Sequence, residues 1–165
     1  QVVDAVGTRV PVVAAGGIFD GRGLAAALAL GATGVWMGTR FIATPEAQAV
    51  PGYKDRILAS AEDGTLITRA YTGKTCRVLR TSYAQAFEDA GGVPEPFPLQ
   101  FVRSMEDGAN HLGSDADTLG VDPDKEFMPA GQAVGAIDEL VPAGDLVRSI
   151  VAEAEQVLDR LGSSR

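Results

Sequence analysis

The chain has 165 residues, which is enough for one domain with a sizeable core, since roughly 150 residues is an ordinary domain size. Its net charge of −8 argues against binding to nucleic acid or to an anionic membrane, because both partners are polyanions. A single cysteine excludes an internal disulfide framework, and no apolar run could span a bilayer or act as a secretory leader, so a cytoplasmic protein is predicted.

The first predicted elements form a βαβ unit. Residues 1–6 place apolar side chains at helical spacing and stop at Gly7, as at the end of a helix. Residues 10–15 and 34–41 are short apolar runs bounded or punctuated by glycine, which is typical of strands buried on both faces of a parallel sheet. Between them, residues 24–30 contain alanine and leucine without a helix breaker and predict a helix.

Glycines stand where both predicted strands end. Gly16 and Gly17 follow the first strand and Gly38 follows the second, at the carboxyl ends where parallel α/β proteins bind ligands. A residue without Cβ lets backbone N–H groups approach an anion closely, and the hydroxyl of Thr39 adds an uncharged donor. One phosphate could therefore bridge both turns. Trp36 and Met37 point to opposite sides of their strand, so one of them faces the ligand side.

A dinucleotide fingerprint is the competing interpretation of this region. Residues 21–26 fit G-x-G-x-x-A, but residues 16–20 separate them from the strand end, and no acidic residue for a ribose follows at the expected distance. Asp20 is better explained as the N-cap of the helix. Arg22 and Arg40 could contact a phosphate, and surface pairing with the excess carboxylates explains both equally well.

A mainly helical structure is predicted for the rest of the chain, residues 45–165. Helices are expected at four places: residues 45–49, 51–61, 77–90 and 142–161. Residues 66–71 are β-branched and aromatic and predict a short extended segment. Residues 105–126 are polar, acidic and dotted with glycine, which predicts a mobile surface insertion.

Few other side chains offer catalytic chemistry. Cys76 has no histidine nearby in the sequence and is interpreted as a small buried hydrophobe or an unreactive thiol. The aspartates of residues 115–124 lack the EF-hand order of ligands, so no metal site is predicted. His111 is the only histidine and invites the role of a base near neutral pH.

Two motifs resemble a known family. Val-Val-Ala-Ala-Gly-Gly-Ile-Phe-Asp-Gly-Arg-Gly (residues 12–23) and Met-Gly-Thr-Arg-Phe (residues 37–41) are similar to the last two βα units of the nitronate monooxygenase (2-nitropropane dioxygenase-like) family. The likeness covers most of the chain except about residues 91–126.

Members of that family are FMN-dependent (β/α)8 barrels, so the resemblance implies an α/β fold made of the C-terminal part of a TIM barrel. Residues 1–44 would supply strands 7 and 8 of the FMN-binding barrel. Residues 45–165 would form a mainly helical C-terminal extension of the same domain, with a variable insert at about residues 91–126.

The resemblance also implies a cofactor site made of small residues that bind the FMN phosphate: Ala15, Gly16, Gly17, Gly38 and Thr39. It assigns no catalytic residue to this sequence, because the family's catalytic histidine lies in an earlier loop. His111 stands in the insert, matches no family motif and stays unassigned. Gln132 is one candidate for a contact with the flavin.

The implied reaction oxidises an alkyl nitronate with O2 to a carbonyl compound and nitrite. A complete barrel needs about 200 to 250 residues, and the first residue is Gln1 rather than methionine. We therefore expect part of a longer enzyme that is inactive alone, with the barrel completed by an N-terminal part or a partner chain. Two alternatives stay open: an FMN-dependent enoyl-acyl carrier protein reductase, and a non-catalytic module that binds a phosphate-bearing ligand or a partner.

Overall fold

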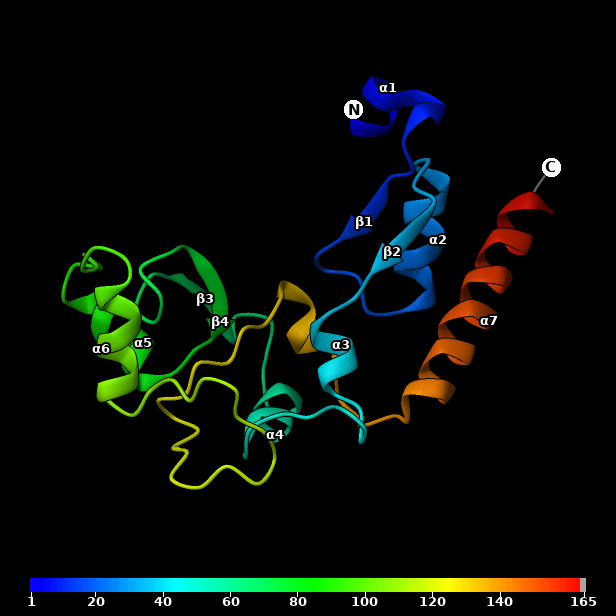
Figure 1. Ribbon diagram of the computed structural model, residues 1–165. Coiled ribbons are helices and arrows are strands. Elements are labelled where there is room, and N and C mark those ends of the chain that lie inside the picture. Colours follow the sequence, from blue (N-terminus) through cyan, green and yellow to red (C-terminus); the bar gives the residue numbers. More distant parts are fainter. Residues whose placement is uncertain (164–165) are drawn as a thin grey trace.

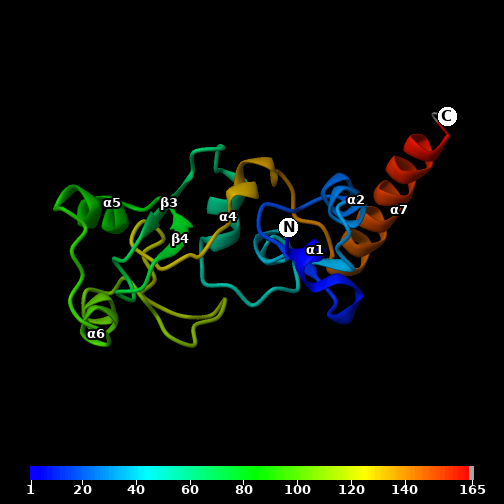
Figure 2. The same ribbon diagram turned by 90° about the horizontal axis from the view of Figure 1, so that it is seen from above.

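The computed structural model describes residues 1–163 and arranges them as two groups of elements joined by a central segment (Figure 1). The first group holds a strand pair and two long helices: β1 (Val13–Ala15), α2 (Gly21–Ala29), β2 (Gly34–Trp36) and α7 (Ala143–Gly162). The second holds a hairpin and two helices: β3 (Thr65–Thr68), β4 (Cys76–Leu79), α5 (Ser82–Asp89) and α6 (Leu99–Glu106). Seen from above, the two groups lie at opposite ends of an elongated molecule (Figure 2).

The predicted βαβ unit is confirmed. Strands β1 and β2 are parallel, with Val13 opposite Gly34 and Ala15 opposite Trp36. The side chain of Asp20 accepts a hydrogen bond of 2.9 Å from the amide of Gly23, so α2 begins at Gly21 rather than at residue 24. A short helix, α1 (Val2–Val6), precedes the unit and leads into a 3₁₀ turn, η1 (Gly7–Arg9).

The sequence predicts that the two strands are buried on both faces, and this prediction is wrong. Val13 is 54% exposed and Trp36 is 73% exposed. Helix α2 lies on one side of the strand pair (Figure 1). The apolar run that continues past Trp36 enters a new helix, α3 (Thr39–Ile42), so β2 is also shorter than predicted.

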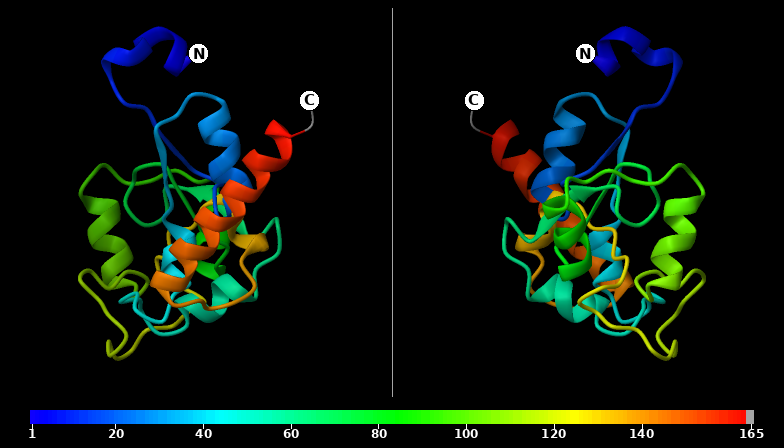
Figure 3. Two further views of the ribbon diagram at one scale, coloured as in Figure 1. Left: turned by 90° about the vertical axis from the view of Figure 1, so that its right-hand side faces the viewer. Right: turned by 90° about the vertical axis from the view of Figure 1, so that its left-hand side faces the viewer.

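Helix α7 packs against α2, and the two helices cross at an angle (Figure 3). Gly21 makes this possible, since a Cβ there would lie 2.6 Å from both the amide nitrogen of Ala154 and the Cβ of Glu153. The predicted helix is confirmed, and Leu146, Ile150 and Ala154 form its buried stripe. Other apolar residues predicted for the same stripe stay exposed: Val151, Leu158 and Leu161.

The second group corrects the sequence prediction. A single helix over residues 77–90 is wrong, because residues 76–79 pair antiparallel with β3 as β4, and only residues 82–89 form a helix. Val78 and Leu79 are both almost fully buried, and Thr81 starts α5 by accepting from the amide of Ala84. The predicted surface insertion exposes its aspartates, but Ala109, Asn110 and Glu126 near its ends are buried.

The central segment connects the two groups. It contains α3, a second short helix α4 (Tyr53–Leu58) and a 3₁₀ turn η2 (Gln132–Ala136), which pack together through Ala43, Ile57 and Val134. The helix predicted at residues 45–49 is wrong, since residues 45–46 form a turn and residues 47–49 are not helical, and α4 is shorter than the predicted 51–61. Within residues 1–163, no helix is both long enough and apolar enough to cross a bilayer.

Candidate functional site

A pocket of about 210 Å³ lies where β1 and β2 end. Its walls bring together all five residues predicted to bind a phosphate: Ala15, Gly16, Gly17, Gly38 and Thr39. Gly16 and Gly17 have φ values of +91° and +72°, which side chains rarely adopt, so the turn after β1 requires glycine. A Cβ added at either position would meet no atom within 4 Å, so these glycines border open space.

The second turn supplies the start of α3. Gly38 is its N-cap, and a Cβ there would also meet no atom within 4 Å. The amides of Thr39 and Arg40 begin the helix, where backbone N–H groups have no partner inside the helix. The carboxyl ends of the two parallel strands therefore meet at one pocket, and the start of α3 adds backbone N–H groups that have no partner inside the helix.

The hydroxyl of Thr39 is oriented by a residue far away in the sequence. The amide of Gly131, just before η2, donates a hydrogen bond of 2.9 Å to Thr39 Oγ1. Because a hydroxyl both accepts and donates, this bond leaves the O–H of Thr39 available as a donor. Gly131 and Ala133 line the pocket and Gln132 is exposed, so the neighbours of Gln132, rather than Gln132 itself, form this wall.

Arg40 is not a surface residue, which corrects one interpretation of the sequence. Its side chain is only 6% exposed, and its Nη1 donates a hydrogen bond of 2.9 Å to the carbonyl of Glu139. Burial lowers the pKa of Arg40, and the nearby carboxylates of Glu139 and Asp138 oppose that shift. Arg22, by contrast, is exposed and pairs with Asp20 at 2.6 Å.

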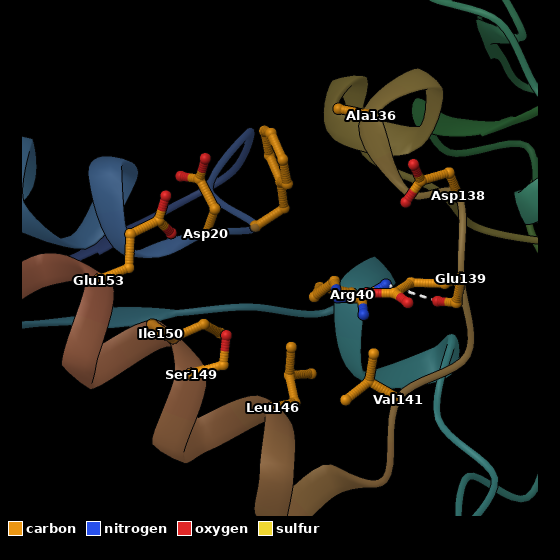
Figure 4. Close-up of a pocket in the computed structure, with 11 residues that line it drawn as sticks. Asp20, Arg40, Ala136, Asp138, Glu139, Val141, Leu146, Ser149, Ile150 and Glu153 are labelled. Carbon is orange, nitrogen blue, oxygen red and sulfur yellow. Dashed lines mark hydrogen bonds between the residues drawn. The ribbon is translucent and has the colours of Figure 1, made fainter.

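A second pocket lies beside Arg40 (Figure 4). The guanidinium of Arg40 meets the carbonyl of Glu139 there, with Leu146 and Ile150 of α7 on the opposite wall. Its acidic lining is Asp20, Asp138, Glu139 and Glu153. The guanidinium of Arg40 therefore donates its hydrogen bond to the backbone carbonyl of Glu139, at this second pocket.

The first pocket fits a phosphate group. The pocket offers a ligand backbone N–H groups and one hydroxyl, and its glycines border open space. None of the described residues that line the pocket is acidic. Trp36, which is largely exposed, and Ile18 add an apolar side. Within residues 1–163, no group of three or more acidic, histidine or cysteine side chains could hold a metal ion. The backbone N–H and hydroxyl donors at this pocket favour an anionic ligand.

His111 and Cys76 lie in the second group of elements. The carboxylate of Glu126, which is 2% exposed, approaches His111 twice: 3.1 Å from its amide and 2.6 Å from Nδ1. Sequence spacing gave no signal for this pair, because it forms across the acidic loop. Cys76 is half-buried and burial raises its pKa, which agrees with an unreactive thiol.

Comparison with known proteins identifies the family. A sequence model described as nitronate monooxygenase matches residues 1–153. A carboxyl-CoA dehydrogenase of Rhodococcus jostii is 34% identical, and the alignment covers 100% of this chain and 55% of that protein. This chain spans about half the length of the curated relatives it matches.

Solved structures agree with this result. FabK from Thermotoga maritima superposes with a TM-score of 0.76 at 34% identity, covering 94% of this chain and 48% of the other. A nitroalkane oxidase from Streptomyces ansochromogenes gives a TM-score of 0.76 at 31% identity, covering 98% and 43%. The predicted fold, part of a (β/α)8 barrel followed by a mainly helical extension, is confirmed, with the β3–β4 hairpin as an addition. The chain belongs to the nitronate monooxygenase family.

Proposed function

We propose that this chain binds the phosphate of FMN in an FMN-dependent nitronate monooxygenase. The observation that carries the proposal is the meeting of two glycine turns and an oriented hydroxyl in one pocket at the carboxyl ends of adjacent parallel strands. The family match supplies the chemical context, because it covers residues 1–153. The proposed phosphate ligands are Ala15, Gly16, Gly17, Gly38 and Thr39.

Each of these residues has a distinct task. The turn at Gly16 and Gly17 brings backbone close to the anion without a side chain in between. Gly38 leaves the start of α3 open, so that its first amides can donate, and Thr39 donates through its hydroxyl. These contacts orient the cofactor and hold it, while FMN itself supplies the electron transfer between an alkyl nitronate and O2.

The catalytic base is not proposed to lie in this sequence. The pocket is lined by small residues, Ile18, Trp36 and Arg40, and none of these side chains is a carboxylate, an imidazole or a thiol. We propose that barrel strands outside these 165 residues, or on a partner chain, contribute the proton-accepting group. On this proposal the 165 residues alone bind the phosphate end of FMN without oxidising a nitronate.

A second candidate function is reduction of an enoyl thioester. It is favoured by the similarity to FabK, an enoyl-acyl carrier protein reductase, and by a relative whose name denotes a carboxyl-CoA substrate. The same phosphate pocket would serve either reaction, since both use FMN. The two functions differ in the reductant and in the product.

The test uses the native protein that carries this sequence. Release of bound cofactor and mass analysis should give FMN, and aerobic incubation with a nitronate should produce nitrite without added NADH. Consumption of NADH with an enoyl thioester, in the absence of nitrite release, would establish the second candidate instead. If the purified protein contains no flavin and binds none when FMN is added, both candidate functions are refuted. Size-exclusion chromatography with flavin absorbance then shows whether the chain holds FMN alone or only with another polypeptide.

A further inference from the structure

Residues 129–139, here called the return segment, are tied to α3 at two points. At one end the amide of Gly131 donates to Thr39 Oγ1 at 2.9 Å. At the other end Arg40 Nη1 donates to the carbonyl of Glu139 at 2.9 Å. Two adjacent residues of α3 thus bind the two sides of η2, and both bonds join parts of the chain more than ninety positions apart, with separations of 92 and 99.

The rest of the return segment is held by the core. Tyr53 donates its hydroxyl to the carbonyl of Pro129, and the amide of Ala130 donates to the carbonyl of Arg77 at 3.1 Å. Val134 is fully buried and Ile137 is 2% exposed. The segment is therefore anchored at its start and middle, and beyond Ile137 the bond from Arg40 is what fixes its end to α3.

We propose that the return segment is the third wall of the phosphate pocket and that Arg40 is a positioning residue, which fixes the end of this wall while the core contacts fix its start and middle. The proposal rests on the proposed FMN function. Gly131 and Ala133 line the pocket, so a shift of the return segment widens it. The same shift removes the bond that orients the hydroxyl of Thr39, which then loses its fixed direction toward the phosphate.

Arg40 acts through position rather than through its charge. Its guanidinium is buried and donates to the carbonyl of Glu139, with Asp138 on the same side (Figure 4). A methionine at residue 40 has a similar length and keeps much of the packing but cannot donate. Lysine keeps a donor and should partly restore the bond to Glu139.

The test measures the phosphate contribution alone, as the ratio of the Kd for riboflavin to the Kd for FMN. Riboflavin lacks only the phosphate, so a general loss of fold or of ring contacts lowers both affinities and leaves the ratio unchanged. Arg40→Met should lower the ratio roughly tenfold, the effect of one misplaced hydrogen bond to a charged group. Arg40→Lys should recover part of the ratio, and Arg148→Met, which alters an exposed arginine of α7, should match the wild type.

A second pair of variants tests the other end of the segment. Gly131 has φ −82°, close to the angle that proline imposes, so Gly131→Pro removes the N–H with little change in φ. Gly131→Ala keeps the N–H, and its Cβ would make only ordinary contact, 3.6 Å from Thr39 Oγ1. The ratio for Gly131→Pro should fall well below that for Gly131→Ala.

The outcomes separate this inference from the proposed function. If the wild type binds riboflavin as tightly as FMN, or binds neither, both proposals fail. If the wild type prefers FMN and neither Arg40→Met nor Gly131→Pro changes the ratio, only the wall and its positioning residue are refuted. If Arg40→Met lowers the ratio while Gly131→Pro equals Gly131→Ala, Arg40 contacts the phosphate directly and the positioning role is wrong.

Discussion

Gly38 offers the most direct test of the phosphate pocket, because alanine fits there in the protein alone. A Cβ built on Gly38 meets no atom within 4 Å, and the φ of −96° is accessible to alanine. Replacing glycine by alanine at such a position stabilises folded proteins by about 0.4–1 kcal/mol, since the unfolded chain loses freedom. The free energy of unfolding of Gly38→Ala, measured with urea, should therefore equal or slightly exceed that of the wild type.

The effect on FMN binding should be opposite. The added methyl group would occupy the space through which a phosphate approaches the first amides of α3. A hydrogen bond to a charged group is worth about 1.5–3 kcal/mol, so the loss of one should weaken FMN binding roughly 10- to 150-fold in a calorimetric titration. Gly144→Ala is the matched control, since it lies on α7 and its Cβ would reach only the flexible guanidinium of Arg148 at 3.6 Å. Undiminished FMN affinity in Gly38→Ala would refute the pocket assignment.

Three further changes test the packing around the site. Gly21→Ala should lower the free energy of unfolding by about 1–3 kcal/mol, because its Cβ would collide with the α7 backbone at the Ile150 carbonyl and the Ala154 amide. Thermal unfolding measures this loss, and an unchanged Tm would contradict the packing of α2 against α7. His111→Ala should cost about 1–3 kcal/mol in urea unfolding, since it removes the side-chain hydrogen-bond partner of the buried Glu126 carboxyl group, and a cost near zero would count against that pair. Burial raises the pKa of Tyr71 to about 12, above the value near 10 of an unfolded tyrosine, so its contribution to stability is complete below pH 10 and is lost as the pH rises toward 12. Urea unfolding across pH 8–11 should show a steeper alkaline loss in the wild type than in Tyr71→Phe, and equal slopes would exclude this cause.

Features set by neighbours in the sequence were predictable. The βαβ unit follows from two apolar runs and the helix between them, and the cap at Asp20 follows from its place before that helix. The sequence was enough to predict that the five proposed phosphate ligands lie close together, because the carboxyl ends of parallel strands share one edge of a sheet. All five line the same pocket.

Features set by distant parts of the chain were not predictable. Val78 and Leu79 fit a helical pattern equally well, and only pairing with β3 makes them a strand. The sequence around Arg40 is compatible with a surface residue, because its hydrogen-bond partner, the carbonyl of Glu139, lies 99 residues later in the chain. Gly131 carries no signal of its own, because its role is a bond to Thr39 across 92 residues.

The chemistry of the pocket depends on where its donors point. The chain carries a net charge of −8, and an acidic protein lowers the concentration of anions around it. Arg40, the one basic residue among the described residues that line the pocket, gives its hydrogen bond to a backbone carbonyl. On the proposed function, phosphate affinity comes from N–H and O–H groups, whose hydrogen bonds are stronger in a partly enclosed site than in water when the donors point at the anion. On this proposal the turn at the two glycines with positive φ supplies one set of donors, and the amide of Gly131 orients the hydroxyl of Thr39. On the proposed function, an acidic chain binds an anionic cofactor through the fixed directions of its backbone and hydroxyl donors.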